Sequence, residues 1–164
     1  MNVFLEQSDF IDRDPRTARN KTTRGFHQSY TVDERTQTRR NYAMLPPDWI
    51  KGKSLLDLGC CVGASGGWSL SHGASSYTGV EISPDLAEIS RENLSRYHPR
   101  KDWKIIQSSV EDLFENHDGR YDIIQASGVF YAFSDSTGMM LKMARLTDCI
   151  IIEGMHPRRP TGYE

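Results

Sequence analysis

The stretch SLLDLGCCVGASGGWSL, residues 54–70, decides the fold, because an apolar run leads through a glycine-rich turn into a helix. The run SLLDL carries three leucines in five positions, which is typical of a strand that is buried on both faces. Glycines in the turn allow close backbone approach, and the first turn of the following helix presents free N–H groups. The stretch therefore predicts a ligand site at the carboxyl end of the strand.

The same alternation of apolar runs and helical patterns continues along the chain. Four further strands are predicted at residues 77–82, 103–109, 121–127 and 148–154. Helices are predicted at residues 64–72, 84–97, 110–115 and 135–146, the third of them a single turn. This alternation predicts a three-layer α/β fold, in which a doubly wound parallel sheet lies between two layers of helices.

Residues 1–50 precede this pattern and are interpreted as an N-terminal arm and helix, with one ligand-binding domain over residues 51–164. Thr31 and Glu34 have the spacing of a capping box. The helix is expected to bury Tyr42, Met44 and Leu45 and to end at a Pro-Pro pair. Residues 11–40 hold eight Lys or Arg against four Asp or Glu, so the arm is either a solvated, partly mobile extension or a lid or surface for an anionic substrate, and it is also a candidate to cover the sheet edge.

Composition limits the remaining possibilities. The chain has 164 residues and a net charge of -2, which fits one domain with no overall attraction to nucleic acid or membrane. It shows neither an apolar run of about 18 residues nor a signal peptide, so a cytoplasmic protein without membrane segments is expected. Three cysteines without a CxxC pair and five scattered histidines predict neither a disulfide framework nor a metal site.

Two ligand classes compete for the glycine turn. A dinucleotide would require GxGxxG, but counting from Gly59 the next two glycine positions hold Cys61 and Ala64. Asp57 at the strand end would also repel a pyrophosphate. A nicotinamide-dependent oxidoreductase is therefore disfavoured, and competition by NAD would be needed to support it.

A ligand with a positively charged amino-acid portion reverses this argument. Asp57 can hold an ammonium group, and Glu81 at the end of the second strand can accept both hydroxyls of a ribose. A nucleoside that carries an amino-acid tail and no phosphates fits both acids. S-adenosylmethionine has this structure.

Four blocks resemble, in order and spacing, the signature blocks of the class I, Rossmann-like S-adenosylmethionine-dependent methyltransferases. They are LLDLGCCVG (55–63), YTGVEISPDLAEISRENL (77–94), SSVEDL (108–113) and YDIIQASGVFYAF (121–133). The resemblance implies the strand order 3-2-1-4-5, a methyltransferase of the EC 2.1.1 class, S-adenosylmethionine as cofactor and S-adenosylhomocysteine as product. It also implies that the cofactor contacts residues of four loops: Asp57, Gly59, Cys60, Cys61, Gly63, Glu81, Ile82, Ser109, Val110, Glu111, Ser127 and Gly128.

Besides Cys61 in the glycine turn, the sequence departs from the family pattern after the third strand and at its end. Ser109 stands where family members usually carry an acid for the adenine amino group, so adenine selectivity is expected to depend on backbone groups. The family sheet has seven strands, but this chain stops at Glu164, about ten residues after the fifth. The expectation is either a fragment or a compact variant lacking the last two strands, with the open sheet edge covered by the arm, a second copy or a partner chain.

The acceptor is a small molecule, an RNA or a protein group, and the sequence does not choose among them. Methyl transfer mainly requires alignment, and a general base is needed only if the acceptor must lose a proton. Tyr131, His156 and Tyr30 are the candidates for that base. The alternative function is a non-catalytic, methyltransferase-like module that binds the cofactor and needs a partner to complete the acceptor site.

The middle cysteine of the turn is expected to be tolerable rather than required. Cys61 replaces the usual glycine, so Cys61→Gly should keep or improve cofactor affinity. Asp57→Ala or Glu81→Ala should instead weaken affinity by about tenfold or more, or about 1.4 kcal/mol.

Overall fold

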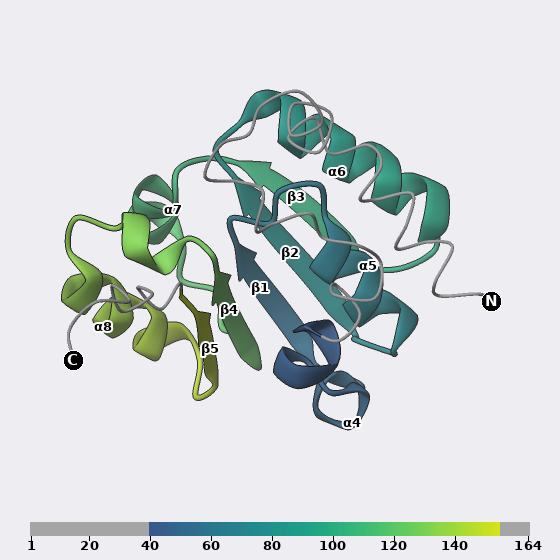
Figure 1. Ribbon diagram of the computed structural model, residues 1–164, viewed down its shortest axis with the longest axis horizontal. Helices are drawn as coiled ribbons and strands as arrows, with labels where there is room; N and C mark the ends of the chain where they lie inside the picture. Colours follow the sequence, from purple (N-terminus) through teal and green to yellow (C-terminus); the bar gives the residue numbers. More distant parts are fainter. Residues whose placement is uncertain (1–39, 155–164) are drawn as a thin grey trace, which may run out of the picture.

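The computed structural model describes residues 40–154, which form one sheet of five parallel strands with helices on both faces (Figure 1). Strand order across the sheet is β3-β2-β1-β4-β5, so the predicted α/β class and the order 3-2-1-4-5 are confirmed. The strands are β1 (Ser54–Leu58), β2 (Ser76–Glu81), β3 (Trp103–Gln107), β4 (Ile123–Ser127) and β5 (Ile150–Glu153).

Two apolar clusters divide the helices between the faces of the sheet. The first packs side chains of β1 and β2 such as Leu55 and Tyr77 against α5 and α6, and the second packs Leu56 and Ile124 against α7 and α8. The helices are α4 (Pro47–Ile50), α5 (Ala64–Ser71), α6 (Pro84–Tyr97), α7 (Val110–Asn116) and α8 (Ser136–Leu146), and a 3-10 turn η2 spans Phe130–Ala132. None of the helices within residues 40–154 is long and apolar enough to cross a membrane.

Side-chain caps fix where three of the helices begin. Ser83 Oγ accepts a hydrogen bond from the N–H of Leu86 at the start of α6, and Pro84 occupies its first position, as the sequence predicts. Ser109 caps α7 and Asp135 caps α8 in the same way. α7 extends over seven residues, so the expectation of a single turn was too short.

The segment before β1 differs from its prediction. Residues 40–44 are helical, but Tyr42 is 53% exposed rather than buried, and its ring lies edge-on against Trp68 with the centroids 4.7 Å apart. A further helix, α4, begins at Pro47, because proline suits a first helical position as well as it ends a preceding helix. The expected capping box at Thr31 lies outside the described residues.

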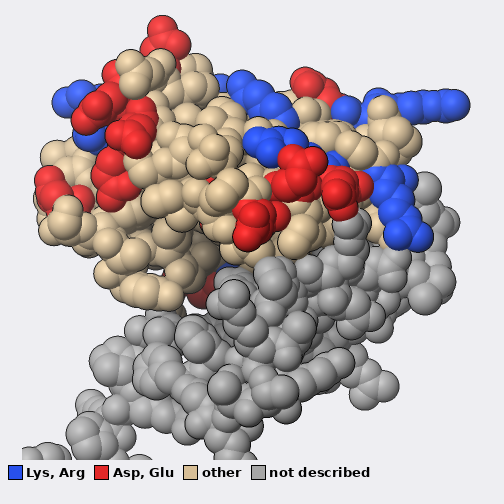
Figure 2. Space-filling model, turned by 90° about the horizontal axis from the view of Figure 1, so that it is seen from above, with Lys and Arg blue, Asp and Glu red and all other residues tan. Residues whose placement is uncertain are grey.

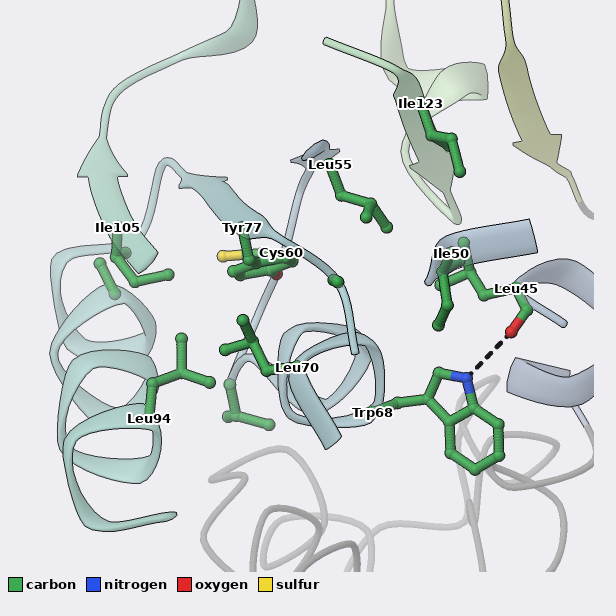
Figure 3. Packing of buried hydrophobic residues seen from close by; sticks show 13 residues of the cluster. Leu45, Ile50, Leu55, Cys60, Trp68, Leu70, Tyr77, Leu94, Ile105 and Ile123 are labelled. Carbon is green, nitrogen blue, oxygen red and sulfur yellow. Dashed lines mark hydrogen bonds between the residues drawn. The ribbon is translucent and has the colours of Figure 1, made fainter. Parts of the chain in front are cut away.

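Trp68 of α5 connects this segment to the core. Its side chain is 1% exposed, and its Nε1 donates a hydrogen bond to the carbonyl oxygen of Leu45 at 3.0 Å (Figure 3). Leu45 and Ile50 are fully buried beside it. The indole therefore attaches residues 40–50 to the sheet through both packing and a buried hydrogen bond.

A reciprocal contact joins the amino ends of β1 and β4. The N–H and the hydroxyl of Ser54 donate to Asp122 Oδ2 at 2.8 and 2.9 Å, and the N–H of Asp122 donates to Ser54 Oγ at 3.0 Å. These hydrogen bonds hold the pKa of Asp122 below its usual range. Because β1 and β4 are the neighbours at which the winding reverses, the contact fixes the register between the two halves of the sheet.

Candidate functional site

The reversal of winding between β1 and β4 places the candidate site at the opposite, carboxyl edge of these strands. The turn after β1 and the loop after β4 meet there closely. A Cβ atom on Gly59 would lie 3.1 Å from Cβ of Val129, and Gly59 has φ 76°. Glycine at this position is required by both the backbone conformation and the space.

Backbone hydrogen bonds and one helix hold the turn of residues 59–63 in place. The N–H groups of Gly59 and Cys60 both donate to the Val80 carbonyl at 2.9 Å, and Asn93 Nδ2 of α6 donates to the Val62 carbonyl at 3.1 Å. Gly63 precedes α5 with φ 81°. Contacts with β2 and α6 within the protein therefore hold the turn in this conformation.

Gly63 allows α6 to approach the turn closely. A Cβ atom there would lie 2.5 Å from Ser90 Oγ, and Ser90 and Asn93 are fully buried. Neither residue was predicted to be buried, because polar residues in a helical pattern normally face solvent. Both polar side chains of α6 face the turn of residues 59–63, where Asn93 binds the Val62 carbonyl and Ser90 lies against Gly63.

Cys61 is the one residue other than glycine with a positive φ among residues 40–154, at 54°. Its N–H donates to Glu81 Oε2 at 2.9 Å, so the left-handed conformation directs this amide toward the end of β2. Left-handed backbone costs a residue with a side chain about 1–2 kcal/mol.

Replacing Cys61 with glycine is expected to raise the free energy of unfolding by about 0.5–1 kcal/mol, because the relief of strain exceeds the entropy cost of a glycine. Denaturant unfolding measures the change. Cys60→Gly is the matched control, since Cys60 is 5% exposed and has no positive φ. That control should destabilise the protein through lost packing. Destabilisation by Cys61→Gly would contradict the assignment of strain to this residue.

Glu81 is the last residue of β2 and its carboxylate is oriented by two backbone amides. Oε2 accepts the Cys61 N–H and Oε1 accepts the Ser83 N–H, each at 2.9 Å. The side chain is 7% exposed. A carboxylate offers about four acceptor positions, so each oxygen keeps one for a ligand hydroxyl.

Asp57 lies deeper, in the middle of the sheet on β1. It is 3% exposed, and Oδ2 accepts a hydrogen bond from the hydroxyl of Tyr77 at 2.8 Å. Burial raises the pKa of Asp57 from 3.8 to about 6, although the Tyr77 hydrogen bond and the charge of Arg40 lower it. The charge of Glu81 adds to the increase in pKa. Sequence reasoning found Asp57 but missed Tyr77.

Cys60 belongs to the packing of the turn. Burial raises the pKa of its thiol well above the usual value, and the charges of Asp57 and Glu81 act in the same direction. Its Sγ occupies the space beside Gly79, where a Cβ atom would lie 2.7 Å away. The side chain of Cys60 is therefore buried and neutral, and it fills space between the turn and β2.

The structure separates the other residues assigned to the nucleoside. Ile82 follows β2 with 67% of its surface exposed, so its apolar side chain lies on the surface directly after the buried Glu81. Ser109 Oγ accepts the Asp112 N–H at 3.0 Å and so caps α7. The side chain of Val110 is 7% exposed and packs in the second apolar cluster, whereas Glu111 is exposed.

The loop after β4 contributes backbone and an exposed phenol. Ser127 Oγ accepts a hydrogen bond from Gln125 Nε2 at 2.8 Å, and the N–H of Gly128 donates to the Glu153 carbonyl at 2.9 Å. Gly128 has φ 67°, and nothing lies within 4 Å of the position of a Cβ atom. Tyr131, in η2, is 61% exposed. The other two candidate bases, Tyr30 and His156, lie outside the described residues.

An ion pair at the carboxyl edge has no signal in the sequence. Arg40 Nε donates to Glu153 Oε2 at 2.7 Å, and Nη2 of the same guanidinium donates to the same oxygen. Glu153 ends β5 and lies in register with Ser127 of β4. The pair joins residues 113 positions apart, a separation at which no local pattern signals contact.

The carboxyl edge is distinct from a hollow on the opposite side of the sheet. That hollow, of about 370 Å³, lies at the amino ends of the strands, and its charges form the pairs Lys53–Asp122 and Arg120–Asp148. Within residues 40–154 no three His, Cys, Asp or Glu side chains are grouped to hold a metal ion. Acidic and basic side chains also share the face seen from above, so that face presents no block of a single charge (Figure 2).

The glycine turn, the two strand-end acids and the sheet order can be compared with known proteins. The sequence pattern named Methyltransf_25, described as a methyltransferase domain, matches residues 55–148. The chain belongs to this methyltransferase-domain family. The match begins in β1 and ends just before β5, so it contains the turn and both acids.

Solved structures of methyltransferases share the fold of this methyltransferase domain. The proposed RNA methyltransferase PH1948 from Pyrococcus horikoshii has a TM-score of 0.60 and 19% identity, with 78% of this chain and 64% of that chain covered. Magnesium protoporphyrin IX methyltransferase (ChlM) from Synechocystis PCC 6803, solved with bound SAH, has a TM-score of 0.57 and 17% identity, covering 70% and 51%.

The methyltransferase domain is also similar to part of the bifunctional kinase-methyltransferase WbdD, with a TM-score of 0.60 and 18% identity, covering 77% of this chain and 29% of that chain. The chain thus spans less than two thirds of the length of each of these three structures. A search of curated proteins finds no match.

Proposed function

We propose that this methyltransferase domain binds S-adenosylmethionine at the carboxyl edge of its sheet and transfers the methyl group to an acceptor by in-line displacement. The observation that carries the proposal is the pair of nearly buried carboxylates, Asp57 and Glu81, on neighbouring strands beside a turn with left-handed glycines. The family match and the bound SAH of ChlM support the cofactor class.

Glu81 has the geometry for the ribose. Its two oxygens are already oriented by the Cys61 and Ser83 amides, so the carboxylate is fixed before a ligand arrives. The acceptor positions left over suit the two neighbouring hydroxyls of a ribose. Ile82 follows directly, and its exposed side chain offers an apolar surface on which the adenine ring would lie.

The amino-acid portion of the cofactor carries both charges, and the site has a group for each. Asp57 would hold the ammonium group. Arg40 would hold the carboxylate, because its charge already acts on Asp57 and its guanidinium is fixed by Glu153. Backbone of residues 59–63 and of Gly128 would surround the methionine portion, and the open space beside Gly128, where nothing lies within 4 Å of a Cβ position, would leave room for it.

The side chain of Ser109 would contribute less to adenine binding than its position after β3 implies. Since its hydroxyl caps α7, the segment 109–111 would meet the adenine edge through backbone groups rather than through this side chain. Glu111 is the acid of that segment, and its exposed carboxylate could accept a hydrogen bond from the adenine amino group.

The sulfonium of the bound cofactor supplies an activated methyl group. The residues of the chain would align it and exclude water, which is worth up to about 7–11 kcal/mol when the reacting atoms are ideally placed. Tyr131 is the described residue that could accept a proton from an acceptor, because its phenol is exposed on the loop after β4. The acceptor class is a small molecule, an RNA or a protein group.

Glu81→Ala is expected to weaken the affinity for S-adenosylhomocysteine by about tenfold or more, about 1.4 kcal/mol, because the variant loses both the ribose acceptor and the support of the turn. Titration calorimetry of the variant against wild type measures this. Glu88→Ala is the control, since Glu88 is exposed on α6 and forms an ion pair with a partly exposed arginine of the same helix, Arg91. Equal affinity of Glu81→Ala and wild type would show that the ribose binds elsewhere.

The binding experiment on wild type tests the proposal itself. Absence of any heat of binding at millimolar S-adenosylmethionine and S-adenosylhomocysteine would refute it. Transfer of a labelled methyl group to separate pools of small molecules, RNA and protein then identifies the acceptor class. Binding without transfer to any pool would favour the non-catalytic module instead.

A further inference from the structure

Tyr77 is the group in direct contact with Asp57, and its hydroxyl is fixed by the packing of its ring. The side chain is 1% exposed. α5 passes so close above it that a Cβ atom on Gly66 would lie 2.5 Å from the ring. The ring is packed between strand and helix, and this packing places its hydroxyl 2.8 Å from Asp57 Oδ2, to which it donates a hydrogen bond.

The Tyr77 hydroxyl reaches Asp57 across a position of β2 that carries no side chain, Gly79. Asp57 pairs in register with Gly79, and Tyr77 precedes Gly79 by two residues, so all three face the same side of the sheet. Tyr77 donates to Oδ2 only, and Oδ1 accepts no hydrogen bond from the described part of the chain. One oxygen of the carboxylate is thus anchored and the other is left for a further donor.

We propose that Tyr77 is a positioning residue for the amino group of the cofactor, because it anchors one oxygen of Asp57 and directs the other at the ammonium. This inference rests on the proposed function, since it concerns the same ligand. It adds a residue outside the glycine turn that determines how well an amino-acid tail is recognised.

Four titratable groups face Asp57 and determine its protonation. Tyr77 and Glu81 come from β2, Cys60 from the turn, and Arg40 from the helix at residues 40–44. The Tyr77 hydrogen bond and Arg40 lower the pKa of Asp57, while burial and Glu81 raise it, with a balance at about 6. Cys60 stays neutral because its own pKa is raised.

Protonation of Asp57 should therefore compete with the ligand ammonium. Affinity is expected to be full at about pH 7.5 and to fall up to tenfold for each pH unit below about 6. The ammonium of the ligand itself loses its proton only near pH 7.7–8.0, so this range reports on the protein.

The test compares Tyr77→Phe with wild type, with S-adenosylhomocysteine as the probe and calorimetry from about pH 5 to 7.5. The variant keeps the ring beside Gly66 but loses the donor. We expect about tenfold weaker affinity at pH 7.5 and a pH midpoint moved upward, because the lost hydrogen bond lowered the pKa of Asp57. Tyr121→Phe, from the second apolar cluster, is the matched control with neither effect.

An Asp57→Asn background separates positioning from general damage. If Tyr77 acts through the carboxylate, adding Tyr77→Phe to Asp57→Asn should change affinity less than twofold. A tenfold loss in both backgrounds, or an unchanged pH midpoint, would overturn the proposal and leave Tyr77 a packing residue. Absence of binding by wild type would refute the proposed function as well.

A second measurement needs no variant and applies even if Tyr77→Phe fails to fold. The ligand 5′-methylthioadenosine has the nucleoside but no amino group. Wild-type affinity for it should be independent of pH across the same range, while affinity for S-adenosylhomocysteine falls. Equal pH dependence for the two ligands would overturn the role of the Asp57 and Tyr77 pair.

Discussion

Replacing Asp57 with asparagine is expected to stabilise the free protein relative to wild type as pH rises, and to weaken cofactor binding by about tenfold or more. Burial raises the pKa of Asp57 from 3.8 to about 6, so the folded state resists the ionised form. Wild type therefore loses stability as pH rises through this window, by roughly 3 kcal/mol in total. Asparagine does not titrate and avoids that loss.

The comparison is made between two pH values so that constant effects of the substitution cancel. Urea unfolding of both proteins at about pH 4 and about pH 7.5 should show the stability of the variant gaining roughly 2–3 kcal/mol on wild type. Asp118→Asn, an exposed site, should leave the difference unchanged. Parallel stability profiles for Asp57→Asn and wild type would contradict the buried, poorly solvated carboxylate.

The opposite signs of these two effects characterise a binding residue. The ammonium of the ligand would supply the solvation that burial takes away, so the carboxylate that destabilises the free protein strengthens the complex. A purely structural acid would lose stability and affinity together.

Trp68→Ala is expected to lower the free energy of unfolding by about 3–5 kcal/mol, the largest stability effect expected for this chain. The side chain is 1% exposed, contacts the rings of Tyr42 and His72, and donates to the Leu45 carbonyl. Its removal leaves a cavity and an unsatisfied buried carbonyl at once. Because it also releases residues 40–50, the position of Arg40 should be lost with it.

Two further tryptophan variants make this prediction specific. Trp68→Phe keeps a ring but no N–H, so its cost should be smaller, about 1–3 kcal/mol. Trp49→Ala removes a side chain that is 62% exposed and should change stability by no more than about 0.5 kcal/mol. Chemical denaturation ranks the three. A cost for Trp49→Ala equal to that for Trp68→Ala would contradict the burial described here.

The fold was predictable because each strand and helix carries its own local signal. Apolar runs of four to six residues alternate with helical patterns, and Ser83 followed by Pro84 marks a helix start that the structure reproduces. The position of Asp57 and Glu81 on neighbouring strands was predictable from the topology, since parallel strands bring their carboxyl ends to one edge. Tyr42 was assigned wrongly because helical spacing does not say which side of a helix its neighbours cover.

The partners of those acids could not be predicted from spacing. Tyr77 at the start of β2 has the pattern of a core residue, and only the register with β1 shows that its hydroxyl reaches Asp57. Arg40 and Glu153 are brought together by the path of the whole chain. The Ser109 hydroxyl could either meet a ligand or cap a helix, and in the structure it caps α7.

The Ser54 and Asp122 contact also bears on how the molecule assembles. β1 to β3 form with the helices between them from neighbouring sequence, whereas β4 must join β1 across 68 residues. Such non-local pairing adds a loop-closure cost that slows folding. Since the candidate site includes the ends of both β1 and β4, it forms only after β4 has joined β1. A growing chain on the ribosome could not offer it before β4 had emerged.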